Sequence, residues 1–543
     1  EAHQHTYSIN QSTMTSTDQT LDAAVTAMTS GKSLFDVTII CTTDDHQAEY
    51  WMKRLSQSLC AAEGSKFPMV LACSEDWASG GAGNGLGTLY AYQKACKLAK
   101  TKFDVDLEQL LMDSKVSAAL FHTAGKGTRM APLPGSENNN KPAVRLPVCQ
   151  KLSSGEFAPV TVLEAVVQQT GVYAASRKGR LSVFWGDQIF IPSAPFEYTP
   201  THHVDIMCTL LGETAPTAEE WAAQGLEKYG VIAVMQGEQR NAAQVEKVNH
   251  ATAVKMLESL GNIGQVGPSL GSFSVSAPFV KAICEEYKTE LTEKTAKLDT
   301  DPHFWMPLTL PEAEYCSLMA QKGIEQDVSK KHHERMAAFK AKLDMGDMGL
   351  FGAVDVGAKA CWWDYGQLKL YSKNNKALLT QDAESTLLRK FFGISDLKAE
   401  SELGSTTVDD VSCVFSCKIE SGSIKSTAMA NVTAKSVELD DAIVVNCVAP
   451  KIVAKKGAIL YNLISTTEIT AEEGDVIVEV MEESGDSTVM KSNISIDGGK
   501  QWKIKLDANE CTFEDVYKKN KDANVTAIEE KRQEKFKKVA SSL

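Results

Sequence analysis

Hydrophobic and polar positions alternate along the first part of the chain in a way that predicts helices and strands in turn. A helical period over residues 20–29 precedes an apolar run over 35–43, which predicts a strand. A helix over 47–62 and a strand over 68–75 follow, before a glycine-rich loop and a helix over 90–100. This alternation is typical of a parallel, doubly wound α/β sheet.

The same alternation continues further along the chain and predicts one large α/β domain over residues 17–400. A strand over 117–123, a helix over 162–170 and a strand over 181–187 extend it. Residues 1–16 are polar, and we expect a flexible lead-in there. Residues 275–345 are charged and mostly helical in pattern, which predicts a lid or a covering layer.

A different pattern begins near residue 405. Three apolar series recur at intervals of 16: Val437, Val453 and Ile469; Ile443 and Ile459; Val448 and Ile464. Three apolar positions per period, separated by polar residues and glycine, favour a parallel β-helix over 405–512. A twisted β-sandwich, whose strands also recur at near-even spacing, is the alternative. We expect the charged tail at 513–543 to be helical and solvated.

Length and composition limit the classes of function. A chain of 543 residues requires two or three domains, and its net charge of −14 argues against nucleic acid as a partner. It contains no apolar stretch long enough for a membrane span, so we expect no membrane partner. Thirteen cysteines without paired spacing predict a reduced, cytoplasmic protein. Because the chain begins at Glu1, a removed plastid or other organelle leader stays open.

The most informative segment follows the strand at 117–123 and reads FHTAGKGTRMAPLPGSENNNKPAVRLP. Gly125 and Gly127 allow backbone N–H groups to turn inward around phosphate oxygens. Lys126, Arg129 and Lys141 supply three cations, which suit a triphosphate that gains charge as pyrophosphate leaves. The segment therefore predicts a triphosphate-binding loop.

Other glycine-loop motifs fit this segment less well. A P-loop needs Ser or Thr directly after Gly-Lys, where this chain has Gly127. A dinucleotide fingerprint needs a third glycine, and Arg129 and Met130 stand there instead. A tight turn with incidental surface charge is the remaining alternative, and the T-R and K-P pairs at this spacing disfavour it.

The string GKGTRM…NKPAV resembles the signature of the sugar-1-phosphate nucleotidyltransferase superfamily, in which G-x-G-T-R precedes a K-P pair. It is especially similar to bacterial N-acetylglucosamine-1-phosphate uridyltransferases. The resemblance implies that Arg129 and Lys141 contact the triphosphate and support its displacement. It also implies nucleotide binding by the loop residues Gly125, Lys126, Gly127 and Thr128.

Two aspartates are candidate ligands for Mg²⁺. Asp187 ends the strand LSVFWGD, and Asp364 follows an aromatic pair in CWWDYG. Open α/β sheets bind ligands at the carboxyl ends of strands, and carboxylate oxygens suit Mg²⁺. Each aspartate alone could serve as a turn or a cap. Both match the superfamily's pattern, a G-D after a strand and a D-x-G after an aromatic residue.

The resemblance also implies a sugar-binding side. A Y-G-V strand that leads to a V-E-K stretch implies such roles for Gly230, Glu246 and Lys247. The superfamily has Asn-x-Gly near the next site position, and this chain has Ser-Leu in front of Gly271. That departure leaves the identity of the sugar open. Lys369 either meets the sugar phosphate or is solvated.

The order of segments differs from most of the superfamily. Only 46 residues separate Lys141 from Asp187, too few for the usual strand-helix-strand unit with its base-binding loop. A unit of that kind lies upstream and ends in LGT, with Gly87 and Thr88 in the base-binding position. We therefore expect a circularly permuted sheet, an order that resembles fucose-1-phosphate guanylyltransferases.

These features predict an enzyme that joins a nucleoside triphosphate to a sugar 1-phosphate and releases pyrophosphate. UTP with glucose 1-phosphate and GTP with fucose 1-phosphate are both consistent with the residues. The alternative from another class is a catalytically silent nucleotide-sugar-binding regulatory or scaffold protein. Acyl transfer by the β-helix is rejected, because residues 405–510 contain neither hexapeptide repeats nor a histidine. Self-association through the β-helix stays open.

Overall fold

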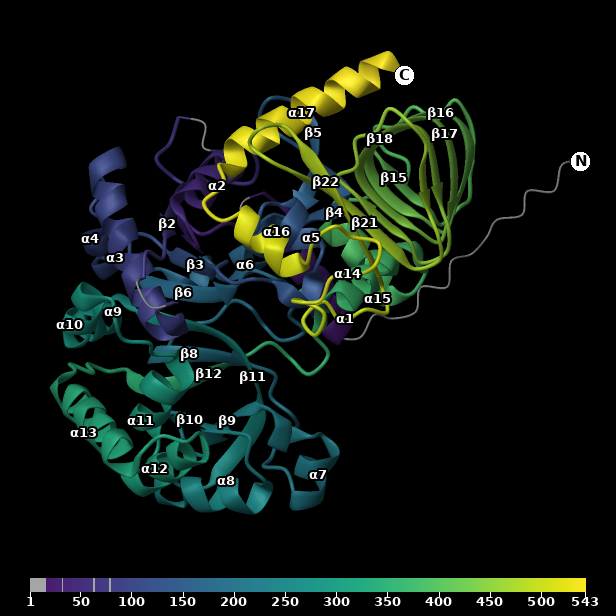
Figure 1. Ribbon diagram of the computed structural model, residues 1–543. Coiled ribbons are helices and arrows are strands. Elements are labelled where there is room, and N and C mark those ends of the chain that lie inside the picture. Colours follow the sequence, from purple (N-terminus) through teal and green to yellow (C-terminus); the bar gives the residue numbers. More distant parts are fainter. Residues whose placement is uncertain (1–15, 32, 62–63, 78–79) are drawn as a thin grey trace, which may run out of the picture.

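The computed structural model describes residues 16–31, 33–61, 64–77 and 80–543, so nearly all of the expected lead-in lies outside the described residues. The first large unit is an α/β fold around a nine-stranded mixed sheet, which confirms the predicted class (Figure 1). Its strands are β1 (Val37–Thr42), β2 (Met69–Ser74), β3 (Ala118–His122), β6 (Arg180–Trp185), β8 (His202–Cys208), β9 (Gly230–Met235), β10 (Ala242–Glu246), β11 (Ile263–Ser276) and β12 (Gly349–Asp355).

The order of strands in this sheet places the upstream unit beside the strand that leads to the phosphate loop. The order is β10-β9-β11-β6-β3-β1-β2, with β8 and β12 joined through β11. Strands β2, β1, β3 and β6 are parallel, so their carboxyl ends meet at one edge. Strand β11 runs antiparallel to β6, β8 and β9 and continues the sheet into the lower part of the molecule. Residues after β2 and after β3 therefore lie side by side.

Helices cover both faces of the parallel strands, because successive residues of a strand point to opposite sides. In β1, Ile40 joins the core cluster that contains Trp51, whereas Ile39 joins the cluster that contains Leu86. The first cluster packs under α1 (Ser16–Thr29), α2 (Asp45–Gln57) and α6 (Val162–Thr170), and the second under α3 (Gly83–Phe103) and α4 (Leu107–Met112).

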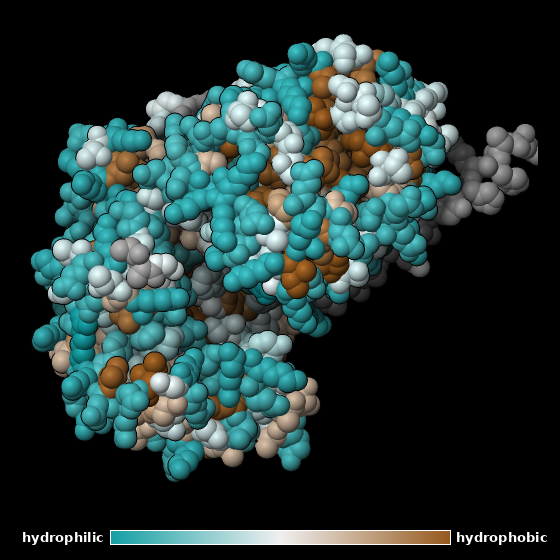
Figure 2. Space-filling model, in the orientation of Figure 1, coloured by the Kyte–Doolittle hydropathy of each residue, from teal (hydrophilic) through white to brown (hydrophobic). Residues whose placement is uncertain are grey.

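The predicted covering layer at residues 275–345 is largely helical. Its helices are α9 (Ala277–Glu286), α10 (Lys288–Glu293), α11 (Met306–Thr309), α12 (Glu312–Gln321) and α13 (Gln326–Lys342). With α7 (Ala218–Ala223) and α8 (His250–Leu257) they surround β9 and β10 in the lower part of Figure 1. Figure 2 shows a mainly hydrophilic face that is hollowed between this lower part and the part above it.

A second nine-stranded sheet, residues 405–493, is built almost wholly from parallel neighbours. Its strands are β14 (Ser405–Val408), β15 (Cys413–Phe415), β16 (Lys418–Lys425), β17 (Ala428–Asp440), β18 (Ile443–Ala454), β19 (Ile459–Tyr461), β20 (Ile469–Ala471), β21 (Asp475–Met481) and β22 (Ser487–Asn493). Ala428, Ile443, Ile459 and Val476 are successive partners, 15, 16 and 17 residues apart. Only β22 pairs in the antiparallel sense.

The register of these strands confirms two of the three predicted apolar series. Ile443 pairs with Ile459, and Val448 forms a bridge with Ile464, as the 16-residue interval predicts. The third series is wrong by one residue, since Val437 pairs with Ile452 rather than Val453. The repeat is uneven because one connection is 15 residues long and the next is 17.

The charged tail forms two helices, α16 (Phe513–Lys519) and α17 (Val525–Ser542). The expectation that it is solvated is wrong for one face, because Phe513, Ile528 and Arg532 are buried. Helix α17 lies along α2, and α16 lies beside the short helix α5 (Leu133–Ser136) of the phosphate-loop segment (Figure 1). The C-terminal elements therefore return to the first unit.

Candidate functional site

The phosphate-loop segment begins where β3 ends and is shaped by its glycines. Gly125 has φ +132 and Gly127 has φ +62, values that L side chains rarely adopt. A methyl group at position 127 would lie 3.1 Å from Cγ of Lys141 and of Pro134. Glycine is therefore required both for the turn and for the close approach of Lys141. The turn continues through Thr128 and leaves the side chains of Lys126 and Arg129 exposed.

The two aspartates lie together although 177 residues separate them in the chain. Strands β7 (Gln188–Ile191) and β13 (Cys361–Asp364) form an antiparallel ladder in which Asp364 pairs with Gln188, the neighbour of Asp187. The N–H of Tyr365 also donates to the carbonyl oxygen of Asp187, at 2.9 Å. This small ladder positions both carboxyl groups.

Gly366 marks the point where the charged groups converge. A methyl group there would lie 2.9 Å from Oδ1 of Asp364, 3.0 Å from Oδ2 of Asp187 and 3.6 Å from Nη2 of Arg129. Lys141 donates from its Nζ to the same oxygen of Asp187. Both predicted metal ligands and both predicted catalytic cations thus share one site.

The electrostatics of the aspartate pair reflect this crowding. Burial raises the pKa of Asp364, and the neighbouring charge of Asp187 raises it further. The N–H of Gly366, which donates to Oδ1 of Asp364 at 2.6 Å, and the charges of Arg129 and Lys141 act in the opposite direction. Two carboxylates that disfavour each other's charge are a suitable place for a divalent cation.

The donor set fits Mg²⁺ bound together with phosphates. Mg²⁺ prefers oxygen ligands and is commonly held by one or two carboxylates, with water and substrate phosphates completing its shell. Asp187 and Asp364 supply that number of carboxylates. No group of three or more His, Cys, Asp or Glu side chains suited to a metal occurs in the described part of the chain. The geometry therefore suits a cation shared with substrate rather than one enclosed by protein.

The predicted base-binding residues lie in a helix, not in the loop that the glycines suggested. Gly87 and Thr88 belong to the first turns of α3 and are buried. A methyl group at position 87 would lie 2.8 Å from Oε2 of Glu75 and 3.6 Å from Cε1 of His122. Thr88 Oγ1 lies 2.8 Å from Nε2 of His122. Glycine is thus used for close approach to two other side chains.

Glu75 and His122 were not identified from the sequence, although both follow predicted strands at the carboxyl edge. Burial lowers the pKa of His122 to about 4, so its ring is neutral near pH 7. Burial raises the pKa of Glu75, whose Oε1 accepts a 2.6 Å hydrogen bond from the N–H of Ala82. Position at a strand end was the available signal for both residues.

The first turn of α3 is closed by the covering layer. The carbonyl oxygen of Leu298 accepts from the N–H groups of Gly85, at 2.9 Å, and Leu86, at 3.2 Å. Oδ1 of Asp299 accepts from the N–H of Asn84 at 3.0 Å. These bonds satisfy N–H groups that a helix start otherwise leaves open. The segment at 298–299 therefore fixes the position of Gly87.

Three of the predicted sugar-side residues lie together. A methyl group on Gly230 would lie 2.9 Å from Oε2 of Glu246 and 3.9 Å from Cβ of Ser269. Glu246 Oε1 is paired with Nζ of Lys247 at 3.0 Å, and the side chain of Lys247 is exposed. These residues end β10 and begin β9, which pair directly.

Gly271 connects this group to the nucleotide side. It has φ +73, and a methyl group there would lie 2.6 Å from Nε1 of Trp185. The ring of Trp185 is 5.7 Å from the ring of His122 and precedes Asp187 by two residues. Lys369 is exposed on α14 (Leu368–Lys376), and no contact ties it to the sugar-side group.

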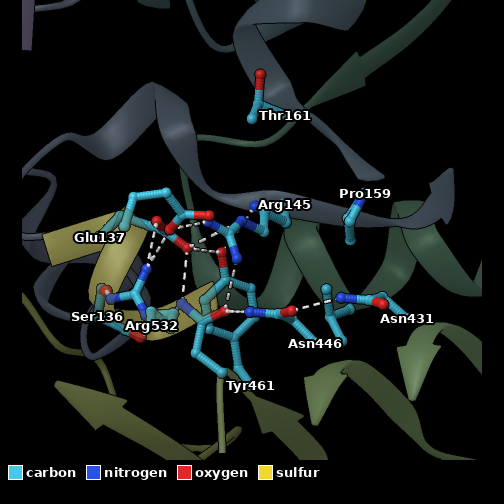
Figure 3. Close-up of polar contacts among 12 residues, drawn as sticks. Ser136, Glu137, Arg145, Pro159, Thr161, Asn431, Asn446, Tyr461 and Arg532 are labelled. Atoms are coloured by element: carbon cyan, nitrogen blue, oxygen red, sulfur yellow. Dashed lines mark hydrogen bonds and ion pairs between the residues drawn. The ribbon is translucent and has the colours of Figure 1, made fainter. Parts of the chain in front are cut away.

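A buried charge cluster supports the phosphate-loop segment from behind (Figure 3). Glu137 lies 3.7 Å from Nε of Arg145 and 3.6 Å from Nη1 of Arg532, and all three side chains are nearly inaccessible. Glu529 accepts from Arg145 at 2.6 Å and from Arg532 at 2.9 Å. Burial alone would raise the pKa of Glu529, but the two arginines outweigh it and lower the pKa to about 2. Helix α17 thus joins the segment between Arg129 and Lys141.

An asparagine ladder joins the second sheet to the same cluster. Asn431, Asn446 and Asn462 all have φ between +53 and +56, and their side chains bond in sequence at 2.6 and 2.7 Å. Asn462 then donates from Nδ2 to Oγ of Ser136 at 2.9 Å and to Oε1 of Glu137 at 2.8 Å. Asparagine tolerates the left-handed conformation, which explains its recurrence at these turns.

Comparison with known proteins adds no relative. No family model matches the chain, and no curated protein matches it either. All thirteen cysteines are free, and no helix among the described residues is both long and apolar enough to cross a bilayer.

Proposed function

We propose that this protein is a Mg²⁺-dependent sugar-1-phosphate nucleotidyltransferase. It condenses a nucleoside triphosphate with a sugar 1-phosphate to give a nucleotide sugar and pyrophosphate. The observation that carries the proposal is the convergence of Asp187, Asp364 and Arg129 within 3.6 Å of one point beside Gly366. Lys141 and the glycine turn at 125–127 border the same point, which is the arrangement that a triphosphate with its cation requires.

The reaction proceeds by in-line attack of a sugar-phosphate oxygen on the α-phosphorus of the nucleotide. The new P–O bond forms as the bond to the β-phosphate breaks, and pyrophosphate leaves with the electron pair. The nucleophile is already an anion, so no side chain has to remove a proton. Mg²⁺ held by Asp187 and Asp364 supplies charge neutralisation at the phosphates. Arg129 and Lys141 stabilise the charge that gathers on pyrophosphate, and rate comes from positioning and electrostatics.

The nucleotide side is assigned to the edge formed by α3 and the phosphate loop. Gly125, Lys126, Gly127 and Thr128 hold the phosphates, and Gly87 and Thr88 border the base. The permuted order is supported by the sheet, since β1 and β2 lie directly beside β3. A unit placed early in the chain thereby reaches the position beside the phosphate loop.

The sugar side is assigned to Gly230, Glu246, Lys247 and Gly271. The contact of Gly271 with Trp185 supports this assignment, because Trp185 lies two residues before the metal ligand Asp187. Lys369 is the weakest member of the predicted set and is retained as a candidate for the sugar phosphate.

Residues 405–481 form a parallel β-helix in this proposal. The parallel partners at intervals of 15 to 17 residues and the asparagine ladder at one turn both support coils stacked on one another. Parallel neighbours disfavour the β-sandwich, which is built from antiparallel sheets. Self-association through these coils stays a prediction.

The test is release of pyrophosphate from a panel of nucleoside triphosphates and sugar 1-phosphates, with and without Mg²⁺. UTP with glucose 1-phosphate and GTP with fucose 1-phosphate are the first pairs. We expect turnover with at least one pair, loss of it without Mg²⁺, and loss of it in Asp187→Asn. Asp410→Asn changes an exposed aspartate at the edge of the second sheet and serves as the matched control. Tight binding of a nucleotide sugar with no turnover across the panel would support the regulatory or scaffold alternative.

A further inference from the structure

A segment of the C-terminal part lies directly against the turn that carries Arg129. Gly498 is buried, and a methyl group there would lie 2.6 Å from the carbonyl oxygen of Thr128 and 3.0 Å from Cβ of Ala131. A methyl group on Gly499 would lie 3.6 Å from Oγ1 of Thr128 and 3.7 Å from Cγ of Arg129. The Gly-Gly backbone therefore touches the phosphate-loop turn, and larger residues would separate the two.

The conformation of this segment is fixed by Asp497. Its Oδ1 accepts hydrogen bonds from the N–H of Gly499 at 3.0 Å and of Lys500 at 3.3 Å. Its carbonyl oxygen accepts from the N–H of Gln501 at 3.0 Å. Residues 497–501 thus form a tight turn whose next side chain after the glycines is Lys500.

Lys500 is a cation without a protein counter-charge. Its side chain is exposed and forms no salt bridge with any residue that the structure describes. Lys503 on the same segment is different, because its Nζ lies 3.9 Å from Glu514. A lysine next to Arg129 that lacks a carboxylate partner is suited to an anionic ligand.

A second contact holds the phosphate loop from the same side. Nζ of Lys126 lies over the ring of Tyr517, 5.6 Å from its centroid. Asn139 donates from Nδ2 to the carbonyl oxygen of Tyr517 at 2.7 Å, and Asn520 donates to that of Gly135 at 2.9 Å. Helix α16 therefore holds the loop in register with the segment that carries Lys500 (Figure 1).

We propose that Lys500 is a further binding residue of the triphosphate site, contributed by the C-terminal part of the chain, and that it holds the pyrophosphate end of the nucleotide. The inference rests on the proposed function, since it needs a triphosphate at Arg129. The two aspartates face the phosphates from one side, and Arg129, Lys126 and Lys500 face them from the other. Leaving pyrophosphate gains negative charge, so a mobile lysine there stabilises departure.

The experiment measures binding of inorganic pyrophosphate with Mg²⁺ to the full-length protein by calorimetry. Lys500→Ala removes the charge, and Lys503→Ala is the matched control on the same segment. We expect Lys500→Ala to weaken binding about tenfold, as loss of a charge-assisted hydrogen bond does, and Lys503→Ala to leave it unchanged. Gly498→Ala tests the docking independently, because its methyl group would displace the segment; we expect it to weaken pyrophosphate binding as well.

The outcomes separate this inference from the proposed function. Equal pyrophosphate affinity in the wild-type protein and Lys500→Ala, or equal weakening by both lysine variants, overturns the role of Lys500 and leaves nucleotidyl transfer standing. Selective weakening by Lys500→Ala supports the role even if the substrate panel gives no turnover, in which case the enzymatic proposal alone fails. Absence of pyrophosphate binding by the wild-type protein overturns the inference.

Discussion

Replacement of Gly366 by alanine tests the candidate site at the point where its charges meet. The backbone of Gly366 is not in the left-handed region, so alanine fits its conformation and only the new methyl group matters. That group would lie 2.9 Å from Asp364 and 3.0 Å from Asp187, closer than carbon and oxygen normally approach. Each carboxylate must therefore move by roughly 0.5 Å or rotate away.

The expected loss follows from the precision that such sites need. A misplacement of about 1 Å in a catalytic arrangement costs roughly a hundredfold in rate. A shift of about half that distance at both metal ligands should lower kcat/KM roughly tenfold to a hundredfold. We also expect the Mg²⁺ concentration needed for half-maximal activity to rise, because the two carboxylates no longer face one cation.

The assay is pyrophosphate release with the best substrate pair, measured against Mg²⁺ concentration. Gly264→Ala is the control, since its methyl group would lie 3.3 Å from the carbonyl oxygen of Val234, far from the aspartates in the chain and without contact to them. Thermal unfolding of both variants shows whether they fold. A folded Gly366→Ala protein with wild-type kcat/KM and wild-type Mg²⁺ dependence would refute the assignment of this site.

Three further predictions concern other parts of the molecule. Because burial and then Asp187 raise the pKa of Asp364, protonation should cost activity at a higher pH than for an ordinary aspartate, and added Mg²⁺ should move this acid limb to lower pH; a limb that ignores Mg²⁺ would contradict the metal role. Arg532→Met should lower the free energy of unfolding by about 3 to 5 kcal/mol in urea, because it leaves Glu137 and Glu529 short of a buried partner. Lys537→Met, on the same helix but in an exposed pair with Glu156, should cost less than about 1 kcal/mol, and equal losses would show that the cluster is not the cause. Gly87→Val should weaken nucleotide binding as severely as Gly127→Val, and unchanged binding would refute the permuted arrangement.

The local pattern of the sequence was sufficient for most elements and for the phosphate loop. Periodicity over 162–170 matches α6 to the residue, and the strand over 117–123 matches β3 within one residue at each end. Helix and strand periods depend on neighbouring residues, so a single sequence reveals them. The glycine spacing likewise depends on local backbone geometry, and Gly125 and Gly127 both have positive φ.

Errors arose where local signals compete. The glycines at 83–87 suggested a loop, yet they begin α3, because Leu298 and Asp299 satisfy the N–H groups of its first turn. Those partners lie more than 200 residues away in the chain. The uneven repeat after residue 428 has the same kind of cause, since the length of each connection is set by packing between coils.

The sequence by itself determined which chemical groups this protein holds: glycines that turn a loop, three cations near them and two aspartates at strand ends. Only the tertiary structure decided that Asp187 and Asp364 face one point, because their proximity depends on the ladder between β7 and β13. It also decided that Gly498 and α17 return to the phosphate loop. Contacts between distant segments depend on the packing of the whole chain, and a local pattern does not encode them.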